Sequence, residues 1–372
     1  MKTILLSFFL SRIFFVIAAY ISSLVIPLNE GYVGRQFSPD SHFLFWAWAN
    51  FDGRHFLNIA STGYQNFDFA YFPLYPLLIS FFSTTALHDF LVSGIAINLV
   101  ALIISLIVVY KIILLDYPKK IARLAIVLLC FFPLSFFYNS VYADALFLML
   151  SSLSFYFARK KNWFLSSVFL SLTICTRLSG VVLSAGIAWE LVFGKAIASN
   201  DIKANFFRWC FQSLILAFLG LLPYLGYLQI VHGDWLLFQK SMVAWGQNSL
   251  VFLPQVIYRY FKILTTVNTH LLVYWVAVFE LLTFIAYMAL SIYVWKKVRQ
   301  SYAVFMVLLL IMVTFTGTLA GTPRYMLHLF PGFIGMAVIL NSRPSIKIAV
   351  LSLFLFTGII LTSLFTRGFF IA

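Results

Sequence analysis

Long runs of apolar residues, separated by short polar segments, fill most of this chain. A run of about 17–25 apolar residues is long enough to cross a membrane as one helix. Runs of this kind fall near residues 4–27, 91–115, 121–138, 141–158, 163–176, 178–194, 209–230, 271–295, 302–320, 325–340 and 346–366. The pattern predicts an all-α polytopic membrane protein with about 11 transmembrane helices.

Two further segments have a helical pattern but differ from ordinary spans. Residues 71–87 are apolar and interrupted by prolines, so they form either another span or a re-entrant helix. Residues 255–267 place basic residues between apolar ones at helical spacing, which predicts a helix in the membrane interface. Because no linker or internal repeat divides the chain, residues 1–372 are expected to form a single membrane domain.

Composition supports the membrane assignment. The 372 residues are 63% hydrophobic and only 10% charged, whereas soluble domains carry about 25% charged residues. The net charge of +14 does not indicate nucleic-acid binding, because the basic residues lie mostly in short loops between apolar runs, where they set orientation. The three cysteines have no metal-ligand spacing, so neither a disulfide nor a structural zinc site is expected.

The distribution of charge predicts the orientation of the chain. If the N-terminus is cytoplasmic and residues 71–87 do not cross, most lysines and arginines, Arg12 among them, fall on the cytoplasmic side. The histidines and most of the acidic residues then fall on the opposite side. The two long outer segments are residues 28–90 and 231–270. Any chemistry is therefore expected on the extracytoplasmic face.

The densest group of charged, polar and aromatic residues spans Asn50 to Pro76, within the first outer segment. Asp52, with Gly53, Arg54 and His55 directly after it, is either a helix N-cap or a candidate general base. The sequence FPLYP forms an aromatic lip at the interface or belongs to an ordinary aromatic belt. The tyrosines of this group are Tyr64, Tyr71 and Tyr75.

Charged residues at the ends of later spans are further candidates. Asp144 lies in an outer hairpin, where it can cap a helix, bind a sugar hydroxyl or pair with an arginine. Arg177 and Arg324 lie at outer span ends beside small or helix-breaking residues, so they either grip a phosphate or extend from a helix end toward water. Glu280 lies within a span and has no partner visible in the sequence. The histidines lack metal-binding spacing, and no metal is expected.

Three pieces of the chain resemble the signature of the PIG-V-type GPI mannosyltransferases and their bacterial relatives. FDGRHFLNIASTGY followed by AYFPLYPLL is similar to the family's W-D-G pattern and its F-F-P-L-Y-P run. SVYADALF with TRLSG, and GTPRYMLHLFPGF, are similar to later family motifs and keep the family order. Phe51 and Phe56 replace a tryptophan and a tyrosine of the pattern, and Asp144 stands where glutamate is common.

The resemblance implies a GT-C glycosyltransferase fold with a large first outer loop that carries short helices. It implies transfer of mannose, or a similar hexose, from a polyprenyl-phosphate-linked donor to an extracytoplasmic glycan or glycolipid, without a metal or cofactor. Asp52 matches the family's catalytic base. The expected substrate-binding residues are Arg54, His55, Tyr64, Tyr71, Tyr75, Asp144, Arg177, Arg324 and Tyr325.

The mechanism expected is a single displacement with inversion, in which Asp52 deprotonates the acceptor. An arginine then stabilises the departing lipid phosphate. The alternative function is a transporter or flippase of lipid-linked sugars. A transporter is expected to show internal repeats and midplane charges, whereas the polar residues of this chain gather on one face.

Overall fold

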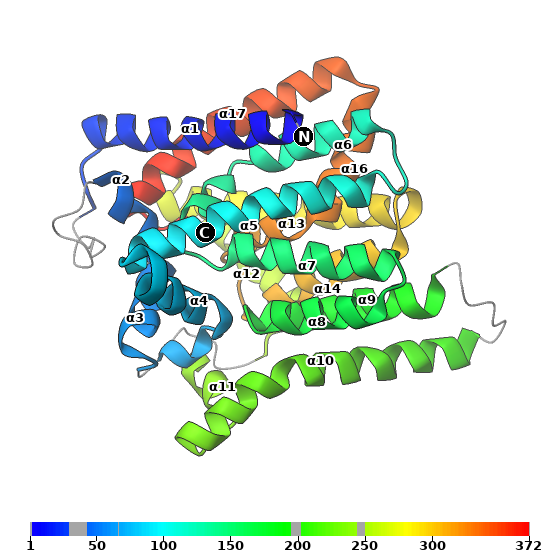
Figure 1. Ribbon diagram of the computed structural model, residues 1–372. Helices are drawn as coiled ribbons and strands as arrows, with labels where there is room; N and C mark the ends of the chain where they lie inside the picture. Colours follow the sequence, from blue (N-terminus) through cyan, green and yellow to red (C-terminus); the bar gives the residue numbers. More distant parts are fainter. Residues whose placement is uncertain (1, 30–42, 66, 195–201, 244–249, 372) are drawn as a thin grey trace. The chain divides into compact units, whose positions relative to one another are not determined.

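The computed structural model describes residues 2–29, 43–65, 67–194, 202–243 and 250–371. Throughout these ranges the regular secondary structure is helical, as Figure 1 shows. The chain divides into two compact units. The first comprises Met1–Ser152 and Met336–Ile371, and the second comprises Leu153–Gly335. Parts of the predicted outer segments, residues 30–42 and 244–249, lie outside the described residues.

The first unit contains two long apolar helices that pack side by side, one from each end of the chain (Figure 1). These are α1 (Lys2–Val25) and α17 (Pro344–Thr366). The other elements of this unit are α2 (Phe43–Trp46), α3 (Asp52–Thr62), α4 (Leu74–Phe82), α5 (Phe90–Ile113), α6 (Lys119–Cys130), the start of α7 (Asp144–Arg159), the end of α16 (Phe330–Asn341), and the short segments η2 (Ala47–Ala49), η3 (Asp68–Ala70), η4 (Ser83–Leu87) and η5 (Ser135–Asn139).

In the second unit, α9 (Val181–Phe193) packs against both α10 (Ile202–His232) and α14 (Gln300–Thr314). Gly186 of α9 permits this close approach, since a Cβ there would lie 3.0 Å from the carbonyl oxygen of Ser301. The unit also contains α8 (Trp163–Ile174), α11 (Leu237–Met242), α12 (Leu253–Thr266), α13 (Leu272–Lys297), α15 (Thr322–Tyr325), the rest of α7 and α16, and the segments η6 (Leu178–Gly180) and η8 (Met326–His328).

Among the described residues, five helices are long and apolar enough to cross a membrane. They are α1, α5, α10, α13 and α17, and the pair Thr322–His328 and Phe330–Asn341, bent by 84°, makes a possible sixth. The chain is therefore an integral, multi-pass membrane protein, as predicted, but the count of eleven spans is not confirmed. Helices α8 and α9 have 12 and 13 residues, which at about 1.5 Å per residue is shorter than a bilayer core.

The apolar run at 121–138 is not one helix. Helix α6 ends at Cys130, and after a turn through Pro133 the chain continues as η5. Proline disfavours helical geometry in the residue before it and has no backbone N–H to donate. The break therefore leaves backbone carbonyl groups that need donors inside the protein, because lipid offers none.

Arg12 of α1 supplies these donors. Its Nη1 donates to the carbonyl oxygen of Ser135 at 2.7 Å and to Oδ1 of Asn139 at 2.9 Å. Its Nη2 donates to the carbonyl oxygen of Cys130 at 3.2 Å and to Oγ of Ser135 at 3.0 Å. Arg12 is 7% exposed, so beyond any effect on orientation it serves as a donor to the broken backbone.

A second buried ionic group, centred on Glu190 of α9, joins three helices of the second unit. Its carboxylate accepts a hydrogen bond from Nη1 of Arg299 at 2.8 Å and from Oγ of Ser301 at 2.6 Å. Nε of Arg159, at the end of α7, lies 3.6 Å from the same carboxylate. The sequence shows these arginines as basic residues of cytoplasmic loops, and does not indicate that they converge on one acid.

We predict that Arg12→Leu destabilises the protein by about 3 kcal/mol or more, because several buried acceptors lose a charged donor. The measurement is unfolding of the detergent-solubilised protein by a graded denaturant. Arg123→Leu is the matched control, since Arg123 is exposed on α6 and its loss should change stability by less than about 0.5 kcal/mol. Equal stabilities of the two variants would contradict the role assigned to Arg12.

Candidate functional site

Asp52 is the first residue of α3, and Phe51 occupies the N-cap position without a side-chain capping bond. Asp52 therefore does not occupy the N-cap position, which was one of its two predicted roles. Phe51 has φ of 52°, an uncommon conformation for a residue with a large side chain. Its ring contacts those of Phe365 and Phe370, at centroid distances of 5.8 and 5.7 Å. These contacts hold the turn that presents the Asp52 carboxylate.

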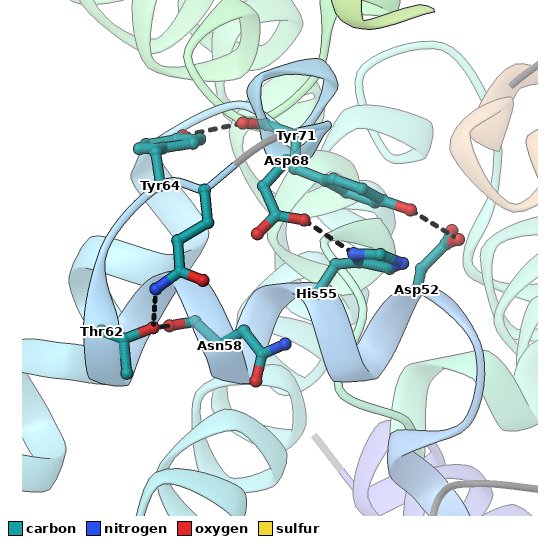
Figure 2. A network of polar contacts seen from close by, with 8 residues as sticks. Asp52, His55, Asn58, Thr62, Tyr64, Asp68 and Tyr71 are labelled. Carbon is teal, nitrogen blue, oxygen red and sulfur yellow. Dashed lines mark hydrogen bonds and ion pairs between the residues drawn. The ribbon is translucent and has the colours of Figure 1, made fainter. Parts of the chain in front are cut away.

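A polar network connects Asp52 to the segment between α3 and α4, as Figure 2 shows. The hydroxyl of Tyr71 donates to Oδ1 of Asp52 at 3.1 Å. The ring of Tyr71 stacks on the imidazole of His55, with 4.9 Å between centroids and 13° between planes. Nδ1 of His55 lies 2.7 Å from Oδ1 of Asp68. Three of the predicted site residues thus form one cluster, joined by a carboxylate that was not among them.

Asp68 is a functional candidate that the motif comparison does not single out. It is 8% exposed, although it lies in the short 3-10 helix η3 between two longer helices. A buried carboxylate is expected to have a partner, and Asp68 has the His55 imidazole. In the sequence, Asp68 is visible only as an acid 13 residues after His55. That separation matches no periodicity that would predict a contact between the two side chains.

Tyr64 organises the same segment from its other end. Its hydroxyl donates to the backbone carbonyl of Tyr71 at 2.7 Å, and its ring stacks on Phe69 at 5.3 Å. Gly63 ends α3 with φ of 83°, a conformation open to glycine. Tyr64 therefore fixes the backbone that carries Tyr71. Arg54 is half-buried on α3.

Tyr75 does not belong to an exposed aromatic lip. Its side chain is fully buried, and its hydroxyl donates to the carbonyl oxygen of Gly94 at 3.0 Å. The ring of Phe56 packs edge-on against both Tyr75 and Tyr71, at 5.1 Å from each. Tyr75 therefore anchors α4 to α5 and supports the cluster around Asp52 through Phe56, instead of lining a surface that a substrate can reach.

The amide of Asn98, fully buried within α5, joins α4 to the segment before α7. Its Nδ2 donates to the hydroxyl oxygen of Tyr75 at 2.9 Å and to the carbonyl oxygen of Tyr142 at 2.8 Å. The carbonyl oxygen of Ser140 is a further acceptor for the same group. Asn98 thus fixes the irregular segment that leads directly to Asp144.

The same segment is bonded to the loop that carries Asp52. The backbone N–H of Val141 donates to the carbonyl oxygen of Trp48 at 2.8 Å. The hydroxyl of Tyr142 donates to the carbonyl oxygen of Asn50 at 2.8 Å, two residues before Asp52. Asp144, fully buried at the start of α7, is therefore tied through this segment to the backbone next to Asp52.

The second unit holds the remaining predicted residues. The guanidinium of Arg177 lies 4.9 Å from the ring centroid of Tyr325, a cation–π contact. Gly180 permits the tight turn after Arg177, because a Cβ there would lie 2.8 Å from the backbone of Ile174. Arg324 precedes Tyr325 in the single turn of α15. Arg177 and the Arg324–Tyr325 pair, far apart in sequence, thus form one group.

Two buried hydroxyls accompany these arginines. Oγ of Ser179 and Oγ1 of Thr322 have no hydrogen-bond partner within the described part of the chain. Each lies two residues from one of the arginines, Ser179 after Arg177 and Thr322 before Arg324. Buried hydroxyls are normally hydrogen-bonded, so these two are available as donors to a ligand.

The predicted site residues therefore form two groups. The first unit assembles Asp52 with Tyr71 and His55, while the second assembles Arg177 with Tyr325. A carboxylate held by a hydroxyl can accept a proton, and an arginine can bind an anion. Among the described residues, no group of three or more His, Cys, Asp or Glu side chains could hold a metal ion.

Comparison with known proteins gives one family. The family model described as Mannosyltransferase (PIG-V) matches residues 4–276 of the chain. No curated protein sequence matches the chain significantly.

Two similar solved structures are those of the Archaeoglobus fulgidus oligosaccharyltransferase. One is a complex with Zn and sulfate, with a TM-score of 0.45 at 12% identity, covering 96% of this chain and 53% of that chain. The other is the apo form, with a TM-score of 0.44 at 11% identity, covering 97% of this chain and 56% of that chain. This chain thus spans about half the length of that protein.

We predict that Asn98→Leu destabilises the protein by about 3 kcal/mol or more, because buried acceptors lose their donor. Thermal unfolding in detergent, followed by intrinsic fluorescence, measures the loss. Asn58→Leu makes the same change at a partly exposed position of α3 and should leave the unfolding temperature within about 2 °C. A fall of similar size in both variants would argue against Asn98 as the anchor.

Proposed function

This chain belongs to the PIG-V mannosyltransferase family, and from that premise we propose that it uses a polyprenyl-phosphate-linked donor. The family makes the chain a membrane-bound glycosyltransferase, so the transporter or flippase alternative is set aside. The proposed reaction moves a mannosyl or similar hexosyl residue to an extracytoplasmic glycan or glycolipid. One observation carries the proposal: the Asp52 carboxylate is held by Tyr71, at 3.1 Å, beside the His55–Asp68 pair.

Asp52 acts as the general base in this proposal. The acceptor hydroxyl attacks the anomeric carbon and loses its proton to the Asp52 carboxylate. The Tyr71 hydroxyl donates to Oδ1 of this carboxylate and so fixes its rotamer. Because Tyr71 is stacked on His55, which Asp68 orients, the base needs little reorganisation during the reaction. His55 and Asp68 are positioning residues here.

Arg177 and Arg324 bind the donor phosphate. The bond that breaks joins the anomeric carbon to a phosphate oxygen, which departs with the electron pair as an anion. That anion needs positive charge nearby and no proton, and a guanidinium supplies two parallel N–H donors. The hydroxyls of Ser179 and Thr322, buried and without partners among the described residues, add donors to the same phosphate.

The proposed stereochemistry and orientation follow from this scheme. A single displacement inverts the anomeric centre, so a β-linked donor gives an α-glycoside, and the arginines make the reaction independent of a metal ion. The site lies on the extracytoplasmic side, with the N-terminus in the cytoplasm. The support for this orientation is the bias of lysine and arginine toward the opposite loops.

Asp52→Asn tests the proposed function. Membranes that contain the protein should transfer labelled mannose from polyprenyl-phosphate-mannose and not from a nucleotide-linked mannose. Asp52→Asn should lower that transfer by about 10²–10⁴-fold, because the amide cannot accept the proton. Asp234→Asn is the control, since Asp234 forms an ion pair with Lys240 on α11 at 2.5 Å. Near-wild-type transfer by Asp52→Asn would remove the base from the mechanism.

The orientation is tested by labelling Gln65→Cys, an exposed position after α3. Cys130 and Cys175 are buried, so a Cys210→Ser background leaves position 65 as the accessible thiol among the described cysteines. A membrane-impermeant maleimide should label this cysteine in intact cells. Labelling that appears only after permeabilisation would show that the loop is cytoplasmic.

A further inference from the structure

Glu280 is a buried carboxylate in α13, one of the five helices long enough to span the membrane. It is 4% exposed. An acidic residue in such a helix needs partners, because desolvating its charge is unfavourable. The structure gives it one: the hydroxyl of Tyr260 donates to Oε2 of Glu280 at 2.5 Å.

Tyr260 lies on α12, the helix that the sequence predicts as interfacial. It is 4% exposed, and its oxygen accepts a hydrogen bond from the backbone N–H of Leu319 at 2.9 Å. Burial, and secondly the charge of Glu280, raise the pKa of Tyr260 well above its ordinary value. The hydroxyl therefore stays protonated and donates to Glu280 while it accepts from Leu319.

The neighbouring residue Arg259 holds the same loop at an earlier point. Its Nη1 donates to the carbonyl oxygen of Gly317 at 2.8 Å. Gly317 has φ of 86°, and a Cβ there would lie 2.7 Å from the Arg259 guanidinium. The loop between α14 and α15, residues 315–321, thus bonds to two consecutive residues of α12. One of them, Tyr260, bonds in turn to Glu280 of α13.

This loop leads directly into α15, which carries Arg324 and Tyr325. Gly321, the last residue of the loop, is the N-cap of that helix and has φ of 76°. Tyr325 in turn lies under the guanidinium of Arg177. Any movement of the loop relative to α12 therefore moves Arg324 and the aromatic ring that Arg177 contacts.

We propose that Arg259, Tyr260 and Glu280 form a clamp, the α12 clamp, that positions Arg324 and Tyr325 for the donor phosphate. The three residues are positioning residues, because their contacts are with the loop and with one another. This inference rests on the proposed phosphate role of Arg324. In this proposal the buried Glu280 is bonded to Tyr260, and its function within the span is to help position Arg324.

Cysteine labelling tests the clamp independently of activity. Ala320 is exposed in the clamped loop, so Ala320→Cys, in the Cys210→Ser background, reports loop opening in the purified protein. Tyr260→Phe should raise the maleimide labelling rate at position 320 about 5–10-fold, because it removes a hydrogen bond that links the loop to a buried acid. Tyr258→Phe, on the exposed face of the same helix, is the matched control and should leave the rate unchanged.

A kinetic measurement tests the link to the donor. Tyr260→Phe in the otherwise native chain should raise the KM for polyprenyl-phosphate-mannose about 5–10-fold, with kcat within about twofold of wild type, because donor binding is lost and the base is not. A variant that only folded less well would lower the active fraction and leave KM unchanged. Glu280→Gln keeps the size of the side chain and can still accept the hydrogen bond from Tyr260, so it should raise the donor KM by a smaller factor. This variant replaces Tyr260→Phe if Tyr260→Phe does not fold.

Unchanged labelling at position 320 in both Tyr260→Phe and Glu280→Gln would overturn the clamp. Faster labelling with an unchanged donor KM would overturn its role in positioning Arg324. A wild-type protein that transfers no sugar from the lipid-linked donor refutes the proposed function instead, and the labelling experiment still decides whether the clamp exists.

Discussion

A backbone that leaves helical geometry inside a membrane must find hydrogen-bond partners within the protein. This constraint shapes the chain at each break described above. Arg12 bonds to the carbonyls at the end of α6, and Asn98 bonds to those of the segment before α7. Arg259 and Tyr260 bond to the loop before α15. In each case a polar side chain from another helix, buried except for the exposed Arg259, provides partners that lipid cannot.

The candidate site residues follow these breaks. Asp144 begins α7 directly after the segment that Asn98 holds, and Arg324 lies in the turn after the clamped loop. Irregular backbone places polar side chains where helical periodicity does not, and supporting hydrogen bonds must then fix that backbone, because catalysis needs exact positions. The buried polar residues that support the breaks are therefore part of how the site is built, although they touch no substrate.

The sequence predicted most helices and the main polar cluster, and it missed what depends on pairing between distant residues. Apolar runs located α1, α5, α13 and α17, and the amphipathic pattern located α12, because these signals are local. The same pattern extended α6 through Pro133, and it did not show that Arg12 bonds to the carbonyl of Cys130, since nothing local links the two residues. The sequence singled out Asp52 and His55 but not Asp68, and it offered Tyr75 as part of an aromatic lip at the interface, although that side chain is fully buried. One-dimensional patterns show that a group is polar, and only the fold shows its partner.

The position of Arg12 has a consequence for the order in which the protein assembles. Its acceptors on Cys130, Ser135 and Asn139 lie more than a hundred residues later in the chain. While the chain is being synthesised, α1 therefore carries a charged side chain whose bonding partners have not yet been made. An arginine near the middle of an inserted helix costs about 2.5–3.5 kcal/mol, so α1 gains its full stability in the bilayer only when the broken end of α6 arrives beside it. The N-terminal helix is thus made more than a hundred residues before the segment that secures it.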